Sequence, residues 1–326
     1  MSDVAVYGAG SWGTALAVVA ANAGHDTALI GRNPEEMRRM KETRENSRYL
    51  PGVSLPERIE PTVDMERLNA SLVILSVPSH HVREAARKIR PYVRTEGIIV
   101  NAAKGLEEQT HDRLSQVLTA ELPDQRIAVL SGPSHAEEVG RNMPTAVVVT
   151  SEQGIAEGVQ EMLMTPAFRI YTNNDLVGVE LGGALKNVVA LCTGIAQGLG
   201  FGDNTKAALI TRGLAEIVRL GVHMGGQPAT FAGLAGMGDL IVTCTSRHSR
   251  NNRAGIALGE GKPLDQVLAE VGMVVEGVHT TRAAYELAQM TGVSMPIVAE
   301  AYQILYQGAD PRAAVTKLML RNKKHE

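Results

Sequence analysis

The chain has 326 residues, of which 44% are hydrophobic and 21% charged, and its formal net charge is −3 at pH 7. This length suits two domains with a sizeable core, and the charge argues against a general nucleic-acid or membrane-surface binder. No run of ~18 uninterrupted apolar residues is present and the first predicted strand begins at residue 4, so we expect no membrane span, no signal peptide and a cytoplasmic location. We interpret Cys192 and Cys244 as small buried residues, and we expect no disulfide and no metal site.

The first thirty residues carry the most informative pattern, a short apolar run followed by a glycine-rich turn and a small-residue helix. We predict a buried strand at Val4–Tyr7, a helix that begins near Ser11 and a second strand at Thr27–Ile30. This order, with glycines at the three positions of a G-x-G-x-x-G motif, is typical of a dinucleotide-binding βαβ unit.

Each glycine of this motif has a physical role. Gly8 permits the tight turn, Gly10 lets the backbone approach a pyrophosphate, and Gly13 lets the helix pack closely on the strand. The helix that follows directs its free N–H groups and the positive end of its dipole at the diphosphate. The sequence therefore predicts a bound dinucleotide.

The residue after the second strand bears on which dinucleotide is bound. Arg32 stands where an Asp or Glu would bind a ribose 2′-hydroxyl, and an arginine there suits a 2′-phosphate. We therefore favour NADP(H) and keep NAD(H) as possible, because Glu35 and Glu36 are near enough in sequence to approach the ribose. The alternative for Arg32 is an ordinary solvated loop residue.

Further apolar runs predict the rest of one mostly parallel sheet. They lie at residues 72–77, 98–101, 127–130, 146–150 and 169–172. The polar connection before the first of them, with Arg44, Glu45, Asn46 and the turn Pro51-Gly52, is predicted to be a lid or a segment that flanks the cofactor. Helical periods dominate after residue 175, and residues 321–326 are expected to be a short solvated tail. We predict an α/β Rossmann-like domain at 1–176 and an all-α, substrate-binding domain at 177–326.

Polar residues follow three of these strands, where ligands of an open α/β sheet bind. The three turns are Ser76-Val77-Pro78-Ser79, Lys104-Gly105 and Ser131-Gly132-Pro133-Ser134-His135-Ala136. We expect them to converge beside the nicotinamide half of the cofactor. The alternative for Lys104 is a surface lysine at a helix start.

Lys186 lies in a long apolar helix and has no other charge beside it. Its neighbours at i−4, i−3, i+3 and i+4 are Gly182, Gly183, Val189 and Ala190. Such a lysine either extends its ammonium to solvent or is kept for its charge. Burial would lower its pKa toward neutrality, which suits proton exchange with a substrate that undergoes hydride transfer.

The segment 233–253 contains a glycine-flanked Asp239 and then Ser249, Arg250 and Asn251 in what we expect to be a short loop. An arginine fork among hydroxyl and amide groups suits a phosphate, although an ordinary basic loop is the alternative. Asp239 is expected either to cap a helix or to bind an ammonium such as that of Lys186.

Seven motifs in order resemble the bacterial type of NAD(P)-dependent glycerol-3-phosphate dehydrogenase over essentially the whole chain. They are GAGSWGTALA at 8–17, NSRYLPG at 46–52, AAKGLE at 102–107, SGPSHAEEV at 131–139, ELGGALKNVVAL at 180–191, GLAGMGDLIVTCTSRHSRN at 233–251 and VVEGVHT at 274–280. Ser134 replaces the threonine often seen in this family, a change that keeps the hydroxyl, and Trp12 fits the family pattern.

The resemblance implies the site residues. Lys186 would be the proton acceptor for alcohol oxidation, with Lys104 and Asp239 shaping its charge. The implied substrate site comprises Lys104, Gly132, Ser134, Lys186, Asp239, Ser249, Arg250 and Asn251. The implied cofactor contacts, beside the three glycines, are Ser11, Trp12, Arg32, Tyr49, Lys104, Ala136, Arg250, Val274 and Glu276. A homodimer and a supply of product to glycerophospholipid synthesis are also implied.

The predicted reaction is the interconversion of dihydroxyacetone phosphate and sn-glycerol 3-phosphate, in which Lys186 moves the proton and Lys104 stabilises the developing alkoxide. One alternative is a 3-hydroxy-acid dehydrogenase or ketopantoate-type reductase of the same architecture, whose substrate anion is a carboxylate. The other is a non-catalytic NADP(H)-binding sensor, against which the intact Lys104, Lys186 and Asp239 count.

Overall fold

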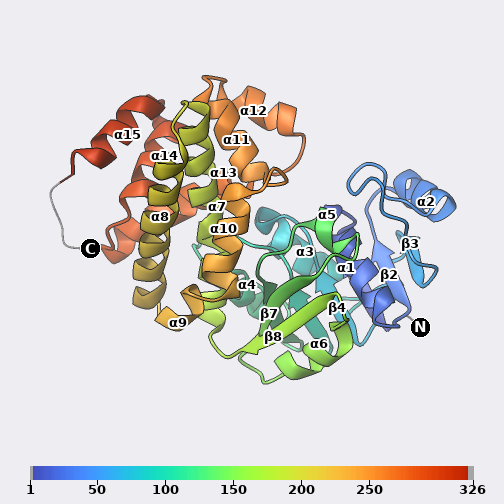
Figure 1. The fold of residues 1–326 in the computed structure, drawn as a ribbon. Coiled ribbons are helices and arrows are strands. Elements are labelled where there is room, and N and C mark those ends of the chain that lie inside the picture. The colour runs from blue at the N-terminus through green and yellow to red at the C-terminus, as the bar shows by residue number, and fades with distance from the viewer. Residues whose placement is uncertain (1–2, 322–326) are drawn as a thin grey trace.

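The computed structural model describes residues 3–321. An eight-stranded sheet with helices on both faces is followed by an all-helical part (Figure 1). The strands are β1 (Val4–Tyr7), β2 (Thr27–Ile30), β3 (Ile59–Thr62), β4 (Leu72–Leu75), β5 (Ile98–Asn101), β6 (Arg126–Ser131), β7 (Thr145–Thr150) and β8 (Phe168–Asn173). The helices and short turns between them are α1 (Ser11–Asn22), α2 (Pro34–Thr43), η1 (Met65–Leu68), η2 (Ser79–His81), α3 (Val82–Ile89), α4 (Leu114–Glu121), α5 (Ala136–Val139) and α6 (Ala156–Leu163).

The strand order is β3-β2-β1-β4-β5-β6-β7-β8, and every neighbouring pair is parallel except β6 and β7. β1 pairs with β2 on one side and with β4 on the other, so the chain reverses its winding direction beside β1. Ligands of an open α/β sheet bind outside the carboxyl ends of the strands at such a reversal. The predicted Rossmann-like, mostly parallel sheet is confirmed.

Alternate side chains of the strands pack on opposite faces of the sheet. Val4 and Val6 of β1 join a cluster with α1, α5 and α6, whereas Ala5 joins a cluster with α3 and α4. These strands are therefore buried on both faces, which explains why they appear in the sequence as continuous apolar runs without a polar alternation.

Strand β3 was not predicted, because we expected only a polar connection between β2 and β4. It is a four-residue edge strand that contains Pro61 and pairs with β2 alone. Proline cannot donate a ladder hydrogen bond but is tolerated at a sheet edge. A short run with a proline therefore gives little strand signal. The third predicted strand also ends earlier, at Leu75.

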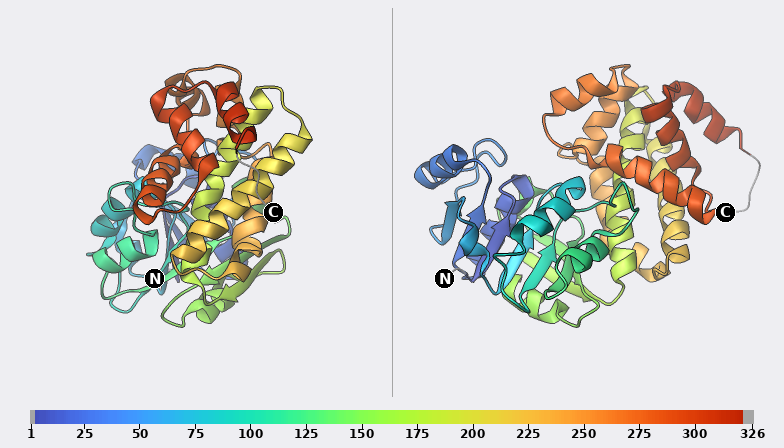
Figure 2. Two further views of the ribbon diagram at one scale, coloured as in Figure 1. Left: turned by 90° about the vertical axis from the view of Figure 1, so that its left-hand side faces the viewer. Right: turned by 180° about the vertical axis from the view of Figure 1, so that it is seen from behind.

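The chain after residue 175 is helical, as predicted. Its elements are α7 (Leu176–Gly198), α8 (Asp203–His223), α9 (Pro228–Phe231), the π-helical turn η3 (Leu234–Gly238), α10 (Asp239–Thr245), α11 (Arg250–Gly259), α12 (Leu264–Val271), α13 (Glu276–Thr291), α14 (Pro296–Gln307) and α15 (Pro311–Met319). The views in Figures 1 and 2 agree that helices α8 and α11–α15 pack beside the sheet rather than over its faces. The proposed boundary at 176/177 falls at the start of α7, and the division into two domains stays a prediction.

Helix α7 is the centre of the helical part and is long and apolar enough to cross a membrane by length and composition alone. Of its most apolar window, 94% is buried inside the protein, which is the behaviour of a core helix. Cys244 is buried as expected, but Cys192 is partly exposed, because it lies on the rim of the α7 core cluster. Of the predicted C-terminal tail, residues 322–326 lie outside the described part of the chain.

Candidate active site

The glycine-rich turn between β1 and α1 has the geometry that its sequence predicts. Gly8 has φ +115°, and a Cβ there would lie 2.3 Å from the carbonyl oxygen of Ser76. A Cβ on Gly13 would lie 1.9 Å from the carbonyl oxygen of Gly8, so α1 packs tightly on this turn. At Gly10, by contrast, a Cβ would meet no atom within 4 Å. Helix α1 has no side-chain cap, so its first N–H groups are available to an anion.

The segment 46–49 lies against this turn. Asn46 donates hydrogen bonds from Nδ2 to the carbonyl oxygen of Ala9 (3.0 Å) and to Thr14 Oγ1 (2.8 Å). The Ser11 hydroxyl donates to the carbonyl oxygen of Tyr49. The polar connection therefore packs on the glycine turn, and that it flanks the cofactor stays a prediction.

Trp12, in the first turn of α1, packs against the core cluster on the α1 face of the sheet. Its indole Nε1 is buried and has no hydrogen-bond partner within residues 3–321. A buried indole N–H without an acceptor is uncommon, and a ligand atom or a water would satisfy it.

Arg32 lies two residues after the end of β2 and is exposed. Of the two carboxylates that we kept as alternatives, Glu36 forms an ion pair with Arg48. Glu35 and Glu36 also donate their backbone N–H groups to Asn33 Oδ1, which caps α2. Arg32 is therefore the exposed cation at the end of β2, while Glu36 is already paired.

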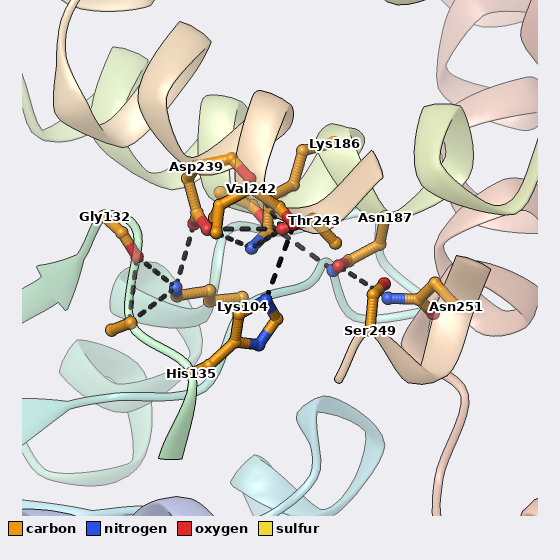
Figure 3. A network of polar contacts seen from close by, with 12 residues as sticks. Lys104, Gly132, His135, Lys186, Asn187, Asp239, Val242, Thr243, Ser249 and Asn251 are labelled. Carbon is orange, nitrogen blue, oxygen red and sulfur yellow. Dashed lines mark hydrogen bonds and ion pairs between the residues drawn. The ribbon is translucent and has the colours of Figure 1, made fainter. Parts of the chain in front are cut away.

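Two lysines and one carboxylate meet where the sheet and the helices come together (Figure 3). Lys104 Nζ, from the turn after β5, donates to Asp239 Oδ2 (2.8 Å). Lys186 Nζ, from α7, donates to the other oxygen, Oδ1, and to Thr243 Oγ1 (2.8 Å). Lys186 and Asp239 are 6% and 1% exposed, so Lys186 does not extend to solvent. Of the two roles expected for Asp239, the structure shows the binding of the Lys186 ammonium. Asp239 is the first residue of α10, but its side chain does not cap the helix.

The electrostatics of this group are set by burial and by the three charges. Burial lowers the pKa of Lys186 from 10.5 to about 8; Asp239 opposes this shift, and the ammonium of Lys104 adds to it. Burial alone would raise the pKa of Asp239, but the two ammonium groups outweigh it, so the pKa of this carboxyl lies below its ordinary value. Lys186 is therefore an amine that can both give and take a proton near neutral pH.

The local sequence explains how α7 can carry this lysine. A Cβ on Gly182 would lie 2.7 Å from the carbonyl oxygen of Ala235, and one on Gly183 would lie 2.6 Å from Ser131 Oγ. The two glycines therefore let α7 approach both the turn η3 and the end of β6. The π-helical turn η3 ends immediately before Asp239, and such turns are frequent at functional sites.

The turns after β5 and β6 converge on Lys104. Its Nζ also donates to the carbonyl oxygen of Gly132 (2.8 Å) and to Ser134 Oγ (3.3 Å). His135 approaches the carbonyl oxygen of Val242 (3.5 Å), and burial lowers the pKa of this imidazole. Ala136 begins α5 directly after these residues and is buried.

The third turn, after β4, meets the same region through α13. Ser79 donates to Glu276 from its backbone N–H (3.0 Å) and from its hydroxyl. A Cβ on Gly105 would lie 2.5 Å from Ser79 Cβ, so the turns after β4 and β5 are also in contact. The three turns therefore lie together, and Glu276 connects them to the helical part.

The segment 249–251 is not the loop that we expected. Ser249 caps α11, and its Oγ accepts the N–H of Asn252 (3.2 Å). Asn251 Nδ2 donates to Asn187 Oδ1 (2.9 Å), and Asn251 Oδ1 accepts the N–H of Gly277 (2.8 Å). The expected loop was wrong, because Ser249 is a standard N-cap and Asn251 lies in the first turn of α11. That the two residues contact the substrate stays a prediction.

Arg250 is the first residue of α11 and is half-buried. Its Nη1 donates to the carbonyl oxygen of Val274 (3.2 Å), which brings two of the implied cofactor contacts together. Arg250 belongs to the first turn of α11, and the positive end of a helix is a favourable place for an anion.

Two polar residues of the site were not assigned a role from the sequence. Thr243 accepts a hydrogen bond from Lys186 and donates one to the backbone carbonyl oxygen of Asp239 (2.6 Å). It stands four residues after Asp239, so the shared helix face was a usable signal. Asn187 accepts from Asn251, a partner 64 residues away, which no local pattern indicates.

Comparison with known proteins gives a consistent match over the whole chain. The model of the NAD-dependent glycerol-3-phosphate dehydrogenase N-terminus matches residues 3–156, and that of the C-terminus matches residues 175–316. A glycerol-3-phosphate dehydrogenase [NAD(P)+] from Desulfitobacterium hafniense (strain Y51) is 68% identical, over 100% of this chain and 93% of its own length. The crystal structure of a glycerol-3-phosphate dehydrogenase from Coxiella burnetii is 39% identical, covers 98% of each chain and has a TM-score of 0.94.

Proposed function

Because this chain belongs to the NAD-dependent glycerol-3-phosphate dehydrogenase family, we propose that it interconverts dihydroxyacetone phosphate and sn-glycerol 3-phosphate with NAD(P)H. The observation that carries this proposal is the buried contact of Lys186 and Lys104 with the two oxygens of Asp239. It puts an amine with a pKa of about 8 at the ligand-binding edge of a dinucleotide-binding sheet.

Lys186 is the proton-transfer group of this reaction. The chemistry that the cofactor supplies when bound is hydride transfer to or from C2 of the substrate. In reduction the Lys186 ammonium gives a proton to the C2 carbonyl oxygen and becomes neutral. In oxidation the neutral amine takes the proton of the C2 hydroxyl, and such transfer contributes ~10²–10⁴-fold in rate.

Lys104 and Asp239 adjust the charge at the reacting oxygen. The Lys104 ammonium stabilises the negative charge that develops on the substrate oxygen in either direction. Asp239 neutralises part of the charge of the two lysines and holds both Nζ atoms in place. Because the carboxylate raises the pKa of Lys186 against the effect of burial, the ammonium form is still available at neutral pH. Thr243 holds the Lys186 ammonium from the side of α10.

The residues of the glycine turn fit a dinucleotide. The open space at Gly10 and the uncapped start of α1 suit a pyrophosphate, and the buried Trp12 Nε1 without an acceptor suits a polar ligand atom. Ser11, Tyr49, Ala136, Val274 and Glu276 complete the proposed contacts. The exposed Arg32 favours the 2′-phosphate of NADP(H), and NAD(H) remains compatible with the same turn.

The substrate is proposed to bind between the turns of the sheet and the start of α11. Gly132 and Ser134 lie beside Lys104, and we expect them to contact the end of the substrate that carries C2. Arg250 and the N–H groups of the first turn of α11 supply donors for the phosphate. Ser249 and Asn251 are proposed to contribute mainly through the backbone, because their side chains are bonded within the helical part.

We also propose four finer properties on the basis of family membership. These are a homodimer, a cytoplasmic location, two domains at 1–176 and 177–326, and a product that feeds glycerophospholipid synthesis. The homodimer is tested by light scattering of the purified protein.

The function is tested by the loss of NADPH absorbance with three substrates at saturating cofactor. Dihydroxyacetone phosphate is expected to give rapid turnover, and dihydroxyacetone and ketopantoate little. Turnover with ketopantoate alone would establish the carboxylate-substrate alternative. NADPH binding without turnover of any of the three would establish the sensor.

A further inference from the structure

Glu180 is a buried carboxylate of α7 that the reaction described above does not use. Its side chain is 4% exposed. Oε2 accepts hydrogen bonds from Arg113 Nη1 (2.6 Å) and from Ser115 Oγ (2.6 Å), and Oε1 accepts the backbone N–H of Ser115 (2.8 Å). Arg113 and Ser115 lie at the start of α4, so this contact joins the Lys186 helix to the sheet domain.

The segment that ends at Arg113 is the one that begins with Lys104. We call residues 104–113 the Lys104 loop. Its two ends are held together by a bridge between Leu106 and Arg113 and by a hydrogen bond from Glu107 N to Asp112 O (3.0 Å). Leu106 is buried in the core cluster that surrounds α7. The loop therefore joins the core cluster around α7 through Leu106 and contacts α7 through Arg113, at Glu180.

The same helix also contacts Lys104 directly. A Cβ on Gly183 would lie 3.7 Å from Lys104 Cγ, and Gly183 is one turn from Glu180 and one turn from Lys186. The contact of α7 with the Lys104 loop and the position of Lys186 therefore involve the same two turns of α7.

We propose that Glu180 is a positioning residue: by binding Arg113 and Ser115 it fixes the Lys104 loop on α7, and so keeps Lys104 and Lys186 on opposite oxygens of Asp239. This proposal rests on the proposed function for its kinetic consequences. A buried ion pair contributes little net stability, because the cost of desolvating its charges offsets their attraction. The role best supported for such pairs is to fix one arrangement of the elements that they join. The Glu180 carboxylate accepts three hydrogen bonds, from a guanidinium, a hydroxyl and a backbone N–H, and three bonds of different direction allow only one arrangement of α7 and the start of α4.

The kinetic test compares Glu180→Ala and Glu180→Gln with a matched control. Glu216→Ala removes another buried carboxylate, whose hydrogen bonds come from the backbone N–H groups of Ile297 and Val298 within the helical part. If the Lys104 loop shifts, the Lys104 charge no longer lowers the pKa of Lys186. The midpoint of kcat for glycerol 3-phosphate oxidation against pH should then rise in Glu180→Ala by on the order of one pH unit. Glu180→Gln keeps one hydrogen-bond acceptor, so the midpoint should rise less in this variant.

A second readout does not depend on turnover. Lys104 Nζ is held by three acceptors and its side chain is 16% exposed. Acylation of Lys104 by an amine-reactive ester, followed by mass spectrometry, should be about threefold or more faster in Glu180→Ala than in wild type, since a free amine reacts only from its unbound state. Glu216→Ala should leave this rate unchanged.

The outcomes separate the two proposals. An inactive wild-type protein would contradict the proposed function, while the acylation rates would still decide the role of Glu180. If Glu180→Ala lowers the melting temperature as Glu216→Ala does, but leaves both the pH midpoint and the Lys104 acylation rate at wild-type values, Glu180 only stabilises the fold. Should Glu180→Ala fail to fold, Glu180→Gln and Arg113→Gln, each expected to shift both readouts in the same direction, replace it.

Discussion

Lys104 and Lys186 bind opposite oxygens of one buried carboxylate, Asp239, although they come from different halves of the chain. The Lys104 ammonium disfavours the charged form of Lys186, while the carboxylate between them favours it. Because Lys186 is buried, the net result is a lysine whose pKa is lowered to about 8. The ability to exchange a proton near neutral pH thus belongs to the three residues together.

Replacing Asp239 with asparagine should lower the pKa of Lys186 below about 8, because the anion that favours the ammonium is lost while Lys104 still opposes it. The oxidation profile should extend to lower pH. Reduction at neutral pH should fall by ~10²-fold, since the proton donor is mostly neutral there. Initial rates in both directions across the pH range test this, and an oxidation midpoint that moves upward would contradict it.

Arg32 is predicted to select the 2′-phosphate. Arg32→Asp should raise KM for NADPH more than KM for NADH, because a charge-assisted hydrogen bond is worth about 1.5–3 kcal/mol. Arg38→Asp, which makes the same charge change at an exposed position of α2, is the matched control and should affect both cofactors little. Equal increases of both constants in Arg32→Asp would show that Arg32 is an ordinary surface residue.

Arg250 is predicted to bind the substrate phosphate. At saturating NADPH, Arg250→Ala should reduce kcat/KM for dihydroxyacetone phosphate by about 10²-fold, the loss of one or two charge-assisted hydrogen bonds. Dihydroxyacetone makes no such contact and should lose much less. Arg247→Ala, at an exposed position just before α11, should change neither value. A common loss for both substrates in Arg250→Ala would assign the residue to the cofactor or to the hydrogen bond with Val274.

Glu216 predicts a pH dependence of stability that is separate from catalysis. Burial raises its pKa from 4.5 to about 7 in the folded protein, against the hydrogen bonds from Ile297 and Val298 N–H. A raised folded pKa contributes stability at low pH that is lost as the pH rises from 4.5 through about 7. Glu216→Gln does not titrate and its carbonyl oxygen can accept the same bonds. Across this window wild type should lose up to about 3 kcal/mol relative to the variant, measured by denaturant unfolding; parallel curves would contradict the assignment.

The central part of the site could be predicted because its signals are local. The glycine motif, the lysine after β5 and the lysine in an apolar helix each stand out within a few residues, and the edge of a parallel sheet brings the first two together. For Asp239 the sequence offered two alternatives, a helix cap or a contact with an ammonium such as that of Lys186. A buried carboxylate and a buried ammonium both need partners, which favours the second.

What could not be predicted depends on long-range packing. Glu180 binds Arg113 from 67 residues away, and no periodicity in α7 distinguishes it from a solvated glutamate. The sequence suggested that Asn251 contacts a ligand, because it stands beside a serine and an arginine. In the structure its side chain forms hydrogen bonds with α7 and α13, and no local pattern indicates these two partners. Strand β3 is defined by its pairing with β2 and not by its own sequence.

The proton-transfer role of Lys186 is tested most directly by kcat for glycerol 3-phosphate oxidation as a function of pH in wild type and in Lys186→Met, with NADP+ affinity and melting temperature measured on the same samples. Wild type should show a rise with a midpoint near the Lys186 pKa of about 8. The variant should bind cofactor and melt as wild type does, lose ~10²-fold or more of kcat and show no rise at that midpoint. A variant that keeps near-normal turnover with the same midpoint would contradict the account and assign the proton transfer to another group.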